Sequence, residues 1–364
     1  MSRRPLRLLM TADAVGGVWQ YAADLARALR PLGIETVIAL LGPAPTPGQR
    51  AELGDIRLIE TGLPLDWLCD GPTPVLAAGE AVAALAAAER VDIVQLNMPT
   101  LLAEARFPCP VVAVTHGCVA TWWAAARATP LSPAYRWHER LTARGLARAD
   151  RVVAPSAAYG AIVARHYDLP RPATVPNGRR PLRVVPGARH DCVFTAGRLW
   201  DEVKNARTLD AVAARLAVPF HAAGAAIGPH GETITLQHLH PLGLLDEAGI
   251  AARLAPRPIF VSAATFEPFG LAVLEAAAAG CALVLSDIPT FRELWSGAAL
   301  FVDPHDEDGF VAAIDSLIGD DRHRVEAGEA ARAAAGRYTP AAMAAGMAAL
   351  IRGLLPTRAR AAAA

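Results

Sequence analysis

Short apolar runs alternate with longer alanine-rich segments along most of the chain. The runs have the length of strands, are rich in Val, Ile and Leu, and lack the apolar–polar alternation of a strand with one exposed face. Such runs predict strands covered on both faces, as in a parallel sheet, and the alanine-rich segments between them predict helices. In the first half the expected strands are 6–12, 34–41, 91–97, 110–116 and 151–156, and the expected helices are 17–32, 133–148 and 157–166.

The segment 177–191 is rich in Pro, Gly and Arg, interrupts this rhythm, and predicts a linker. A second alternation of strands and helices follows it, and the tail from residue 306 is expected to be helical to about residue 354. This order predicts two doubly wound α/β domains that face each other across a cleft, with ligands at the carboxyl ends of the strands. In the second half the expected strands are 192–198, 218–224, 258–263, 281–287 and 298–304, and the expected helices are 204–216, 245–254, 270–279 and 289–295.

The bulk composition is typical of a compact globular protein. Of the 364 residues, 53% are hydrophobic and 19% are charged, and the formal net charge of zero gives no indication of a nucleic-acid partner. We expect no membrane span, because no run of about 20 uninterrupted apolar residues is present. We interpret the start of the chain as a strand rather than a secretory signal. The five scattered cysteines predict reduced, mostly buried thiols in a cytoplasmic protein, without a disulfide frame or a zinc site.

Lys204 is the only lysine among the 35 basic residues, so the other 34 are arginines. It follows the expected strand 192–198, whose carboxyl end carries Arg198. A compact ammonium and a planar guanidinium at one sheet edge suit a diphosphate. The alternative is a solvated loop in which Lys204 pairs with Asp201 or Glu202. The absence of lysine elsewhere favours a function for Lys204.

The stretch "FEPFGLAVLEAAAAG" places two carboxylates around the start of a helix. Glu267 lies in the loop after strand 258–263, and Gly270 and Leu271 open the helix with backbone N–H groups suited to a phosphate. Glu275 follows on an otherwise apolar helix. The helix dipole alone favours a carboxylate there, but a buried carboxylate also needs hydrogen-bond donors, and sugar or ribose hydroxyls would serve.

Two features of the first half are candidates for the same ligand. Gly16 and Gly17, in "TADAVGGVW", lie between a strand and a helix, where an anion or a sugar hydroxyl can bind backbone N–H groups. The alternative is a helix start that needs flexible residues. His116 ends strand 110–116 and is therefore expected at the carboxyl edge of the sheet, although a structural role for this histidine stays open.

Two further patterns have two interpretations each. The acidic run "DEDG" at 306–309 precedes a helix, so we expect an N-cap rather than a metal site. The window 120–151 carries six arginines and three tryptophans, Trp122, Trp123 and Trp137. It predicts either contact with an anionic membrane surface or a solvated helix face above core tryptophans.

Five elements in this order resemble those of family-4 type retaining glycosyltransferases with the GT-B fold. They are the glycine loop "GGVW", the histidine of "THG", the pair "VVAPS" and "VPNG", the stretch "GRLWDEVKN", and the Glu-x7-Glu element "EPFGLAVLE". The resemblance spans nearly the whole chain. It implies an N-terminal Rossmann-like domain on the acceptor side at 1–180, a nucleotide-sugar-binding domain at 181–338, and a closing helix at 339–364 that packs back on the first domain.

By this resemblance the chain is a hexosyltransferase that uses a UDP- or GDP-sugar, retains the anomeric configuration, and requires neither a metal nor a cofactor. The acceptor is unknown and could be a glycan, a lipid-linked molecule or a small molecule. The resemblance also implies roles for the site residues. Arg198 and Lys204 hold the donor diphosphate, together with Gly270, Leu271 and the Gly16–Gly17 loop. Glu275 binds ribose, Glu267 contacts the donor sugar near the reacting carbon, and His116 lies beside the transferred sugar.

Two departures from the family pattern leave alternatives open. Ala263 and Ala264 stand where many relatives have a Pro-Ser or similar pair, and the insert 228–243 has no clear uracil or guanine signature, so the donor is not named. A nucleotide-sugar epimerase or hydrolase of the same fold is the main alternative. A non-catalytic sugar-binding protein is a further one.

Overall fold

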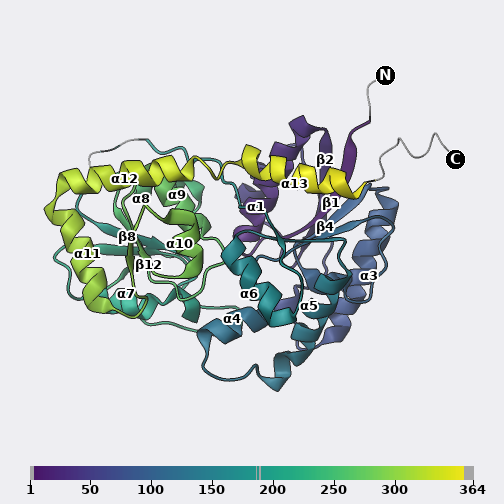
Figure 1. Ribbon diagram of the computed structural model, residues 1–364, viewed down its shortest axis with the longest axis horizontal. Helices are drawn as coiled ribbons and strands as arrows, with labels where there is room; N and C mark the ends of the chain where they lie inside the picture. The colour runs from purple at the N-terminus through teal and green to yellow at the C-terminus, as the bar shows by residue number, and fades with distance from the viewer. Residues whose placement is uncertain (1–3, 186, 188–189, 356–364) are drawn as a thin grey trace. The chain divides into compact units, whose positions relative to one another are not determined.

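The computed structural model describes residues 4–185, 187 and 190–355. The chain divides into two compact units (Figure 1). Unit 1 comprises residues 1–124, 129–178 and 340–364, and unit 2 comprises 125–128 and 179–339. Each unit is built on one sheet in which all neighbouring described strands are parallel. The prediction of two parallel-sheet α/β domains is therefore confirmed.

The sheet of unit 1 has seven strands in the order β3-β2-β1-β4-β5-β6-β7. Gly33 ends the first helical segment with φ +76, a left-handed conformation that glycine adopts without strain. The strands are β1 Leu6–Asp13, β2 Ile34–Leu41, β3 Arg57–Glu60, β4 Ile93–Leu96, β5 Val111–Val114, β6 Arg151–Ala154 and β7 Ala173–Thr174. The helices are α1 Gly17–Leu29, α2 Pro47–Leu53, α3 Pro72–Ala88, α5 Arg136–Arg148, α6 Ala157–Tyr167 and α13 Pro340–Leu354. Helix α4, Val119–Ala126, belongs to unit 1 up to residue 124 and to unit 2 from residue 125.

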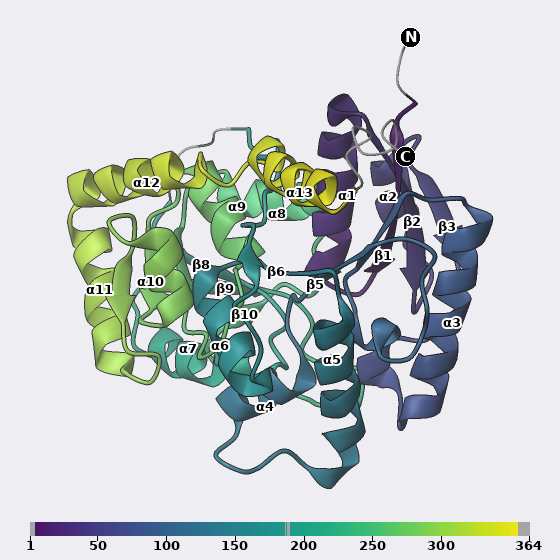
Figure 2. The ribbon, with the colours of Figure 1, turned by 45° about the vertical axis from the view of Figure 1, so that its right-hand side comes forward.

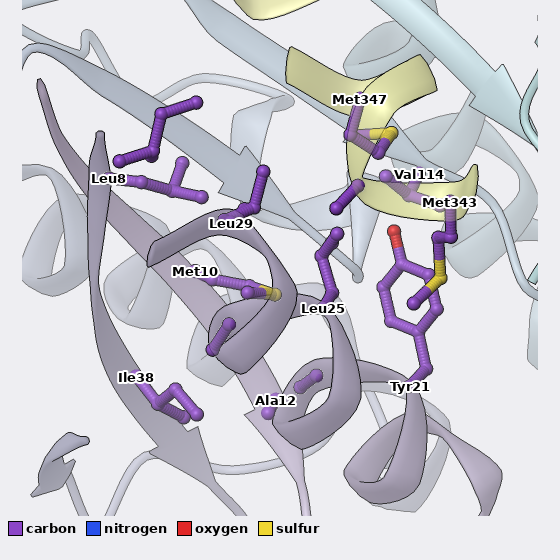
Figure 3. Close-up of a cluster of buried hydrophobic side chains, with 14 of the residues drawn as sticks. Leu8, Met10, Ala12, Tyr21, Leu25, Leu29, Ile38, Val114, Met343 and Met347 are labelled. Atoms are coloured by element: carbon purple, nitrogen blue, oxygen red, sulfur yellow. The ribbon is translucent and has the colours of Figure 1, made fainter. Parts of the chain in front are cut away.

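Both faces of this sheet are covered by helices. Leu8 and Met10 of β1 point to one face, where they meet α1 and α13, while Leu9 between them points to the other face and meets α3. Figure 3 shows Met343 and Met347 of α13 on the same side as the α1 side chains. The closing helix thus supplies part of the core of unit 1, although it comes last in the chain.

The sheet of unit 2 has six strands in the order β10-β9-β8-β11-β12-β13. The strands are β8 Val193–Ala196, β9 Phe220–Ala223, β10 His240–Pro241, β11 Ile259–Ser262, β12 Leu283–Ser286 and β13 Leu300–Val302, and the helices are α7 Ala206–Ala213, α8 Glu247–Leu254, α9 Leu271–Ala279, α10 Pro289–Trp295, α11 Glu307–Gly319 and α12 Asp321–Ala335.

Two hydrophobic clusters cover the two faces of the second sheet. Phe260 of β11 packs with α8, α9, α10 and α12, whereas its neighbours Ile259 and Val261 pack with α7 and α11. Figure 2 shows α9 beside α12, and α7 lies beside α11. Burial on both faces explains why the strands are continuous apolar runs.

The structure differs from the sequence prediction in three respects. Helices α2, α3 and α4 and strands β3, β7 and β10 were not expected. The apolar residues of α3 surround it, so its pattern has no clear helical period. Helix α7 begins at Ala206 rather than Lys204, because Asn205 has φ +54 and separates it from the short 3-10 helix Glu202–Lys204. The helical tail is three helices, broken at Asp320 and before Pro340.

A buried polar group lies inside unit 1. The carboxylate of Asp66 accepts hydrogen bonds from the Thr100 hydroxyl at 2.7 Å and the Trp67 amide at 2.7 Å, and the His138 ring nitrogen Nε2 lies 3.2 Å from it. Burial by itself would raise the pKa of Asp66, but His138 and these two donors outweigh burial and hold this pKa below its usual 3.8. Ionised Asp66 therefore contributes to the stability of unit 1.

Within the described ranges no helix is long and apolar enough to cross a membrane. All five cysteines are free thiols. The expectation that most of them are buried is wrong, because only Cys281 is buried and the other four are partly exposed. Strand ends and loops, rather than the sheet interior, supply those four positions.

Candidate functional site

The residues of "GRLWDEVKN" and "EPFGLAVLE" meet at the carboxyl edge of the sheet of unit 2. Strand β8 ends at Ala196, just before Arg198, and β11 ends at Ser262, just before the loop that carries Glu267. Lys204 Nζ lies 2.5 Å from Glu267 Oε2, and the two side chains are 22% and 17% exposed. A lysine and a glutamate 63 positions apart thus form one partly buried ion pair.

Lys204 is held in place by the backbone around it. The amide of Thr265, in the loop after β11, donates to Val203 O at 2.9 Å. Asn205 Nδ2 donates to Ala263 O at 3.1 Å and to Pro304 O at 2.7 Å, which ties the turn to two strand ends. Sequence reasoning missed Asn205. The sequence feature that could have indicated this role is an asparagine directly after the lysine, because asparagine tolerates the left-handed conformation that this turn needs.

Arg198 forms the second cationic position of this edge. Its Nη2 donates to Asp201 Oδ2 at 2.7 Å, and its guanidinium lies 5.6 Å from the centre of the Trp200 ring. Asp201 is almost fully buried, whereas the Arg198 side chain is 51% exposed. The alternative in which Lys204 pairs with Asp201 or Glu202 is wrong, because Lys204 pairs with Glu267.

Gly270 shapes the start of α9. Its φ of +92 lies in the left-handed region, and a Cβ on this residue would lie 3.1 Å from Cε1 of Phe291. The sharp turn leads directly into Leu271, so the first backbone N–H groups of α9 have no partner within the helix. Glu267 Oε1 accepts from the Phe269 amide at 3.4 Å in the same turn. A helix N-terminus and two cations at one edge provide the chemistry for binding a diphosphate.

Glu275 lies in the second turn of α9 and has a partner that sequence reasoning missed. Arg179 Nε donates to Glu275 Oε1 at 2.8 Å, and Arg179 Nη2 lies 3.5 Å from Glu247 Oε1. Arg179 belongs to the predicted linker, and its side chain is only 6% exposed. Glu275 also lines a cavity of about 160 Å³ with Pro181, Leu182 and other residues. The sequence analysis expected a buried carboxylate at this position to have hydrogen-bond donors, and Arg179 is such a donor.

In unit 1, His116 lies just after β5 in a hydrogen-bonded network. Its Nε2 lies 3.1 Å from Asn97 Oδ1, and the Asn97 amide nitrogen Nδ2 donates to Thr11 O at 2.6 Å. The Tyr21 ring packs edge-on at 4.4 Å. Burial lowers the pKa of His116 to about 4, so the imidazole is neutral at pH 7. Since Asn97 Oδ1 is an acceptor, Nε2 carries the proton and Nδ1 is the acceptor of this ring.

The Gly16–Gly17 loop connects β1 to α1. Asp13 at the end of β1 accepts hydrogen bonds from the amides of Val15 at 2.9 Å and Gly16 at 3.2 Å. A carboxylate therefore binds the first amides of the loop, and α1 begins at Gly17. No atom outside the immediate chain lies within 4 Å of a Cβ built on Gly16, so packing does not require glycine there.

The window 120–151 separates into core and surface residues. Trp137 is buried, whereas Trp122 and Trp123 are partly exposed. Trp123 packs against Tyr135 at 5.9 Å. All six arginines are exposed, and four of them recur every fourth residue along α5: Arg136, Arg140, Arg144 and Arg148. The interpretation of core tryptophans below a solvated helix face thus holds for Trp137 and α5, whereas contact with a membrane surface stays a prediction.

The acidic run at 306–309 caps a helix, as predicted. Asp306 Oδ1 accepts from the Gly309 amide at 2.9 Å at the start of α11. In the described part of the chain no group of three or more His, Cys, Asp or Glu side chains is placed to hold a metal ion.

Two family models match the chain. The model of Glycosyltransferase Family 4 matches residues 15–183, and that of Glycosyl transferases group 1 matches residues 237–334. The first match includes the Gly16–Gly17 loop and His116, and the second includes Glu267, Gly270 and Glu275. The stretch 197–205, with Arg198 and Lys204, lies between the two matched ranges.

Curated relatives match over a shorter stretch. The chain is 36% identical over 99 residues to a phosphatidyl-myo-inositol mannosyltransferase of Mycolicibacterium smegmatis, which is 26% of this chain and 25% of that protein. It is 35% identical over 105 residues to the protein of the same name from Mycobacterium tuberculosis, 26% of this chain and 28% of that one. The chain thus spans about a quarter of the length of the curated relatives it matches.

Solved structures match over nearly the full length. Sucrose-phosphate synthase from Thermosynechococcus elongatus has a TM-score of 0.76 at 18% identity and covers 96% of this chain and 99% of its own. Anabaena HepE in complex with UDP and glucose has a TM-score of 0.73 at 17% identity, with 96% and 100% covered. At such identities the likeness establishes the shared fold. Together with the two family models, it shows that this chain belongs to the family-4 type of glycosyltransferases with the GT-B fold.

Proposed function

We propose that the protein transfers a hexose from a nucleoside-diphosphate sugar to an acceptor, with retention of the anomeric configuration and without a required metal. The observation that carries this proposal is the Lys204–Glu267 ion pair beside Arg198 and the N-terminus of α9. These groups place positive charge and backbone donors next to a carboxylate that suits sugar hydroxyls. The likeness to a family of glycosyltransferases supports it.

In this proposal Lys204 and Arg198 bind the donor diphosphate, and the amides of Gly270 and Leu271 add hydrogen bonds from the start of α9. Both cations already pair with carboxylates, Lys204 with Glu267 and Arg198 with Asp201. Those carboxylates fix the direction of the cations before a donor arrives. A preorganised cation stabilises the negative charge that develops on the departing diphosphate, and this accounts for the catalysis.

We assign the sugar and the ribose to different carboxylates. Glu267 accepts hydrogen bonds from hydroxyls of the donor sugar, and Glu275 from those of the ribose. His116 lies beside the transferred sugar, where its neutral ring accepts a hydrogen bond from a hydroxyl through Nδ1. The amides of Gly17 and the first turn of α1 contribute to diphosphate binding, while Asp13 holds the preceding amides of the loop, including that of Gly16.

The proposed reaction exchanges one bond for another on the same face of the sugar. The bond between the anomeric carbon and the diphosphate oxygen breaks, and the bond to the acceptor oxygen forms on the face that the diphosphate leaves. The acceptor hydroxyl gives its proton to the departing diphosphate. NMR of the product tests this step: an unchanged anomeric configuration supports the proposal, and an inverted one contradicts it.

A binding and turnover screen tests the donor. Ligands that bind the folded state raise the melting temperature, so UDP-, GDP- and ADP-sugars are compared by thermal shift. UDP and GDP donors are expected first; one matching solved structure, Anabaena HepE, contains UDP and glucose, and the curated relatives are named mannosyltransferases. Products are then followed with and without added acceptors. An epimer or a free sugar formed from the donor alone, with no transfer to any acceptor, would favour the epimerase or hydrolase alternative.

Metal independence is tested with a chelator. Turnover is expected to survive EDTA, because Arg198, Lys204 and the start of α9 supply the positive charge that the diphosphate needs. Activity that is lost in EDTA and restored by Mn²⁺ or Mg²⁺ would contradict this part of the proposal.

We also propose a cytoplasmic protein that touches an anionic membrane surface through the window 120–151. Trp122 and Trp123 suit the interface of a bilayer, and the exposed arginines of α5 suit anionic headgroups. The double variant Arg136→Glu with Arg140→Glu should lose sedimentation with phosphatidylglycerol vesicles, which wild type should show and which phosphatidylcholine vesicles should not. Arg322→Glu, an exposed arginine of α12, serves as the control.

A further inference from the structure

Arg179 connects the candidate ribose site to the start of unit 2. It is the first residue of the long segment of this unit, and its backbone amide donates to Tyr338 O at 3.2 Å. Its guanidinium lies inside the protein, with Nε on Glu275 Oε1 at 2.8 Å. The backbone hydrogen bond to Tyr338 fixes the backbone of Arg179, and the ion pair with Glu275 fixes its guanidinium.

The electrostatic environment makes this contact strong. A guanidinium that is 6% exposed binds a carboxylate that is 17% exposed, so water screens the pair little. Glu247 Oε1, 3.5 Å from Nη2, is a second carboxylate against the same guanidinium. Removing the arginine would leave Glu275 shielded from water and without this donor, and the carboxylate would turn toward solvent or bind a proton.

We propose that Arg179 is a positioning residue, which holds the Glu275 carboxylate in the orientation that accepts hydrogen bonds from the two ribose hydroxyls of the donor. This inference rests on the proposed function, in which Glu275 binds ribose. An ionised carboxylate has about four acceptor sites on two oxygens, so it can accept from several donors at once. A bond from Arg179 Nε to Oε1 is therefore compatible with hydrogen bonds from a ribose diol to the same carboxylate.

A purely structural role predicts a different behaviour. If Arg179 only fastens the linker to α9, its loss lowers stability and weakens every nucleotide to the same extent. If Arg179 only adds positive charge, its loss also weakens every nucleoside diphosphate equally. An effect through Glu275 depends on the ribose hydroxyls, so it disappears when the nucleotide lacks them.

The experiment compares UDP and GDP with their 2′,3′-dideoxy forms, by calorimetric titration of the full chain. Arg179→Gln should weaken the nucleotide that wild type binds by about tenfold, the scale of one hydrogen bond to a charged group. It should weaken the dideoxy form by less than about twofold. The control is Arg324→Gln, since Arg324 is equally buried in unit 2, pairs with Asp191, and should change neither affinity.

Arg179→Lys keeps the charge but lacks Nε, the atom that binds Glu275, and it carries the test if the glutamine variant does not fold. A partial loss confined to the nucleotide with ribose hydroxyls supports the proposal. Equal losses for both nucleotides, or no loss for either, overturn it while leaving the proposed function intact. A wild-type protein that binds neither UDP nor GDP overturns the proposed function, and the positioning role with it.

Discussion

Replacing Lys204 by arginine tests whether the lone lysine is kept for its shape or only for its charge. The ammonium lies 2.5 Å from Glu267 Oε2 and is 22% exposed. Its stem runs close to Gly197, where an added Cβ would come within 3.9 Å of Lys204 Cδ. A longer, planar guanidinium would have to displace Glu267 or occupy the place of the diphosphate.

The expected loss follows from the proposed role of this cation. Removing one preorganised charge partner of a transition state costs about 2–4 kcal/mol, which corresponds to a fall in kcat/KM of about 30- to 1000-fold. Lys204→Arg keeps a cation beside Glu267, so its melting temperature should stay close to that of wild type. Lys204→Met should lose at least as much turnover and also some stability, about 1–3 kcal/mol, because it leaves a shielded carboxylate without its partner.

The assay is kcat/KM with the donor identified by the thermal-shift screen, and the melting temperature reports on the fold. Near wild-type turnover of Lys204→Arg would show that charge alone matters here, and that the lone lysine reflects only the composition of the chain. A large fall in melting temperature of the arginine variant would show a role in folding instead of catalysis.

Three further predictions concern other residues of the fold and the site. Glu267→Gln should lower turnover with little change in nucleotide affinity, while Glu275→Gln should weaken the free nucleoside diphosphate by about 1–3 kcal/mol; the opposite pattern in titrations would exchange their roles. Gly270→Ala should lower the free energy of unfolding by about 1–2 kcal/mol, because Gly270 has a φ of +92, whereas Gly16→Ala should not, because Gly16 has an extended φ of −146. Equal urea denaturation midpoints for the two variants would refute this. Since the pKa of Asp66 lies below its usual 3.8 in the folded protein, its contribution to stability is present above about pH 4 and is lost as the pH falls further; urea titrations of Asp66→Asn should show a flatter dependence on pH in that range.

The sequence determined the architecture because the burial of each segment is reflected in that segment's own apolar pattern. Strands covered on both faces must be apolar at every position, and helices between them need enough length to cross back over the sheet. The order of these segments therefore predicted two parallel α/β units, and it predicted that Arg198, Glu267 and His116 follow strand ends. Helix α3 escaped prediction because apolar residues surround it and leave no helical period.

Only the tertiary structure decided which charged groups meet. Lys204 had acidic neighbours at positions 201 and 202, yet it pairs with Glu267, 63 positions away. Glu275 required hydrogen-bond donors, and Arg179 donates to it from 96 positions away, in a segment predicted only as a linker. The Gly16–Gly17 loop looked open to an anion, but Asp13 binds two of its amides. The apolar pattern of a segment indicates whether that segment is buried. The partner of a charged side chain depends instead on the path of the backbone, because that path brings distant segments within hydrogen-bond distance.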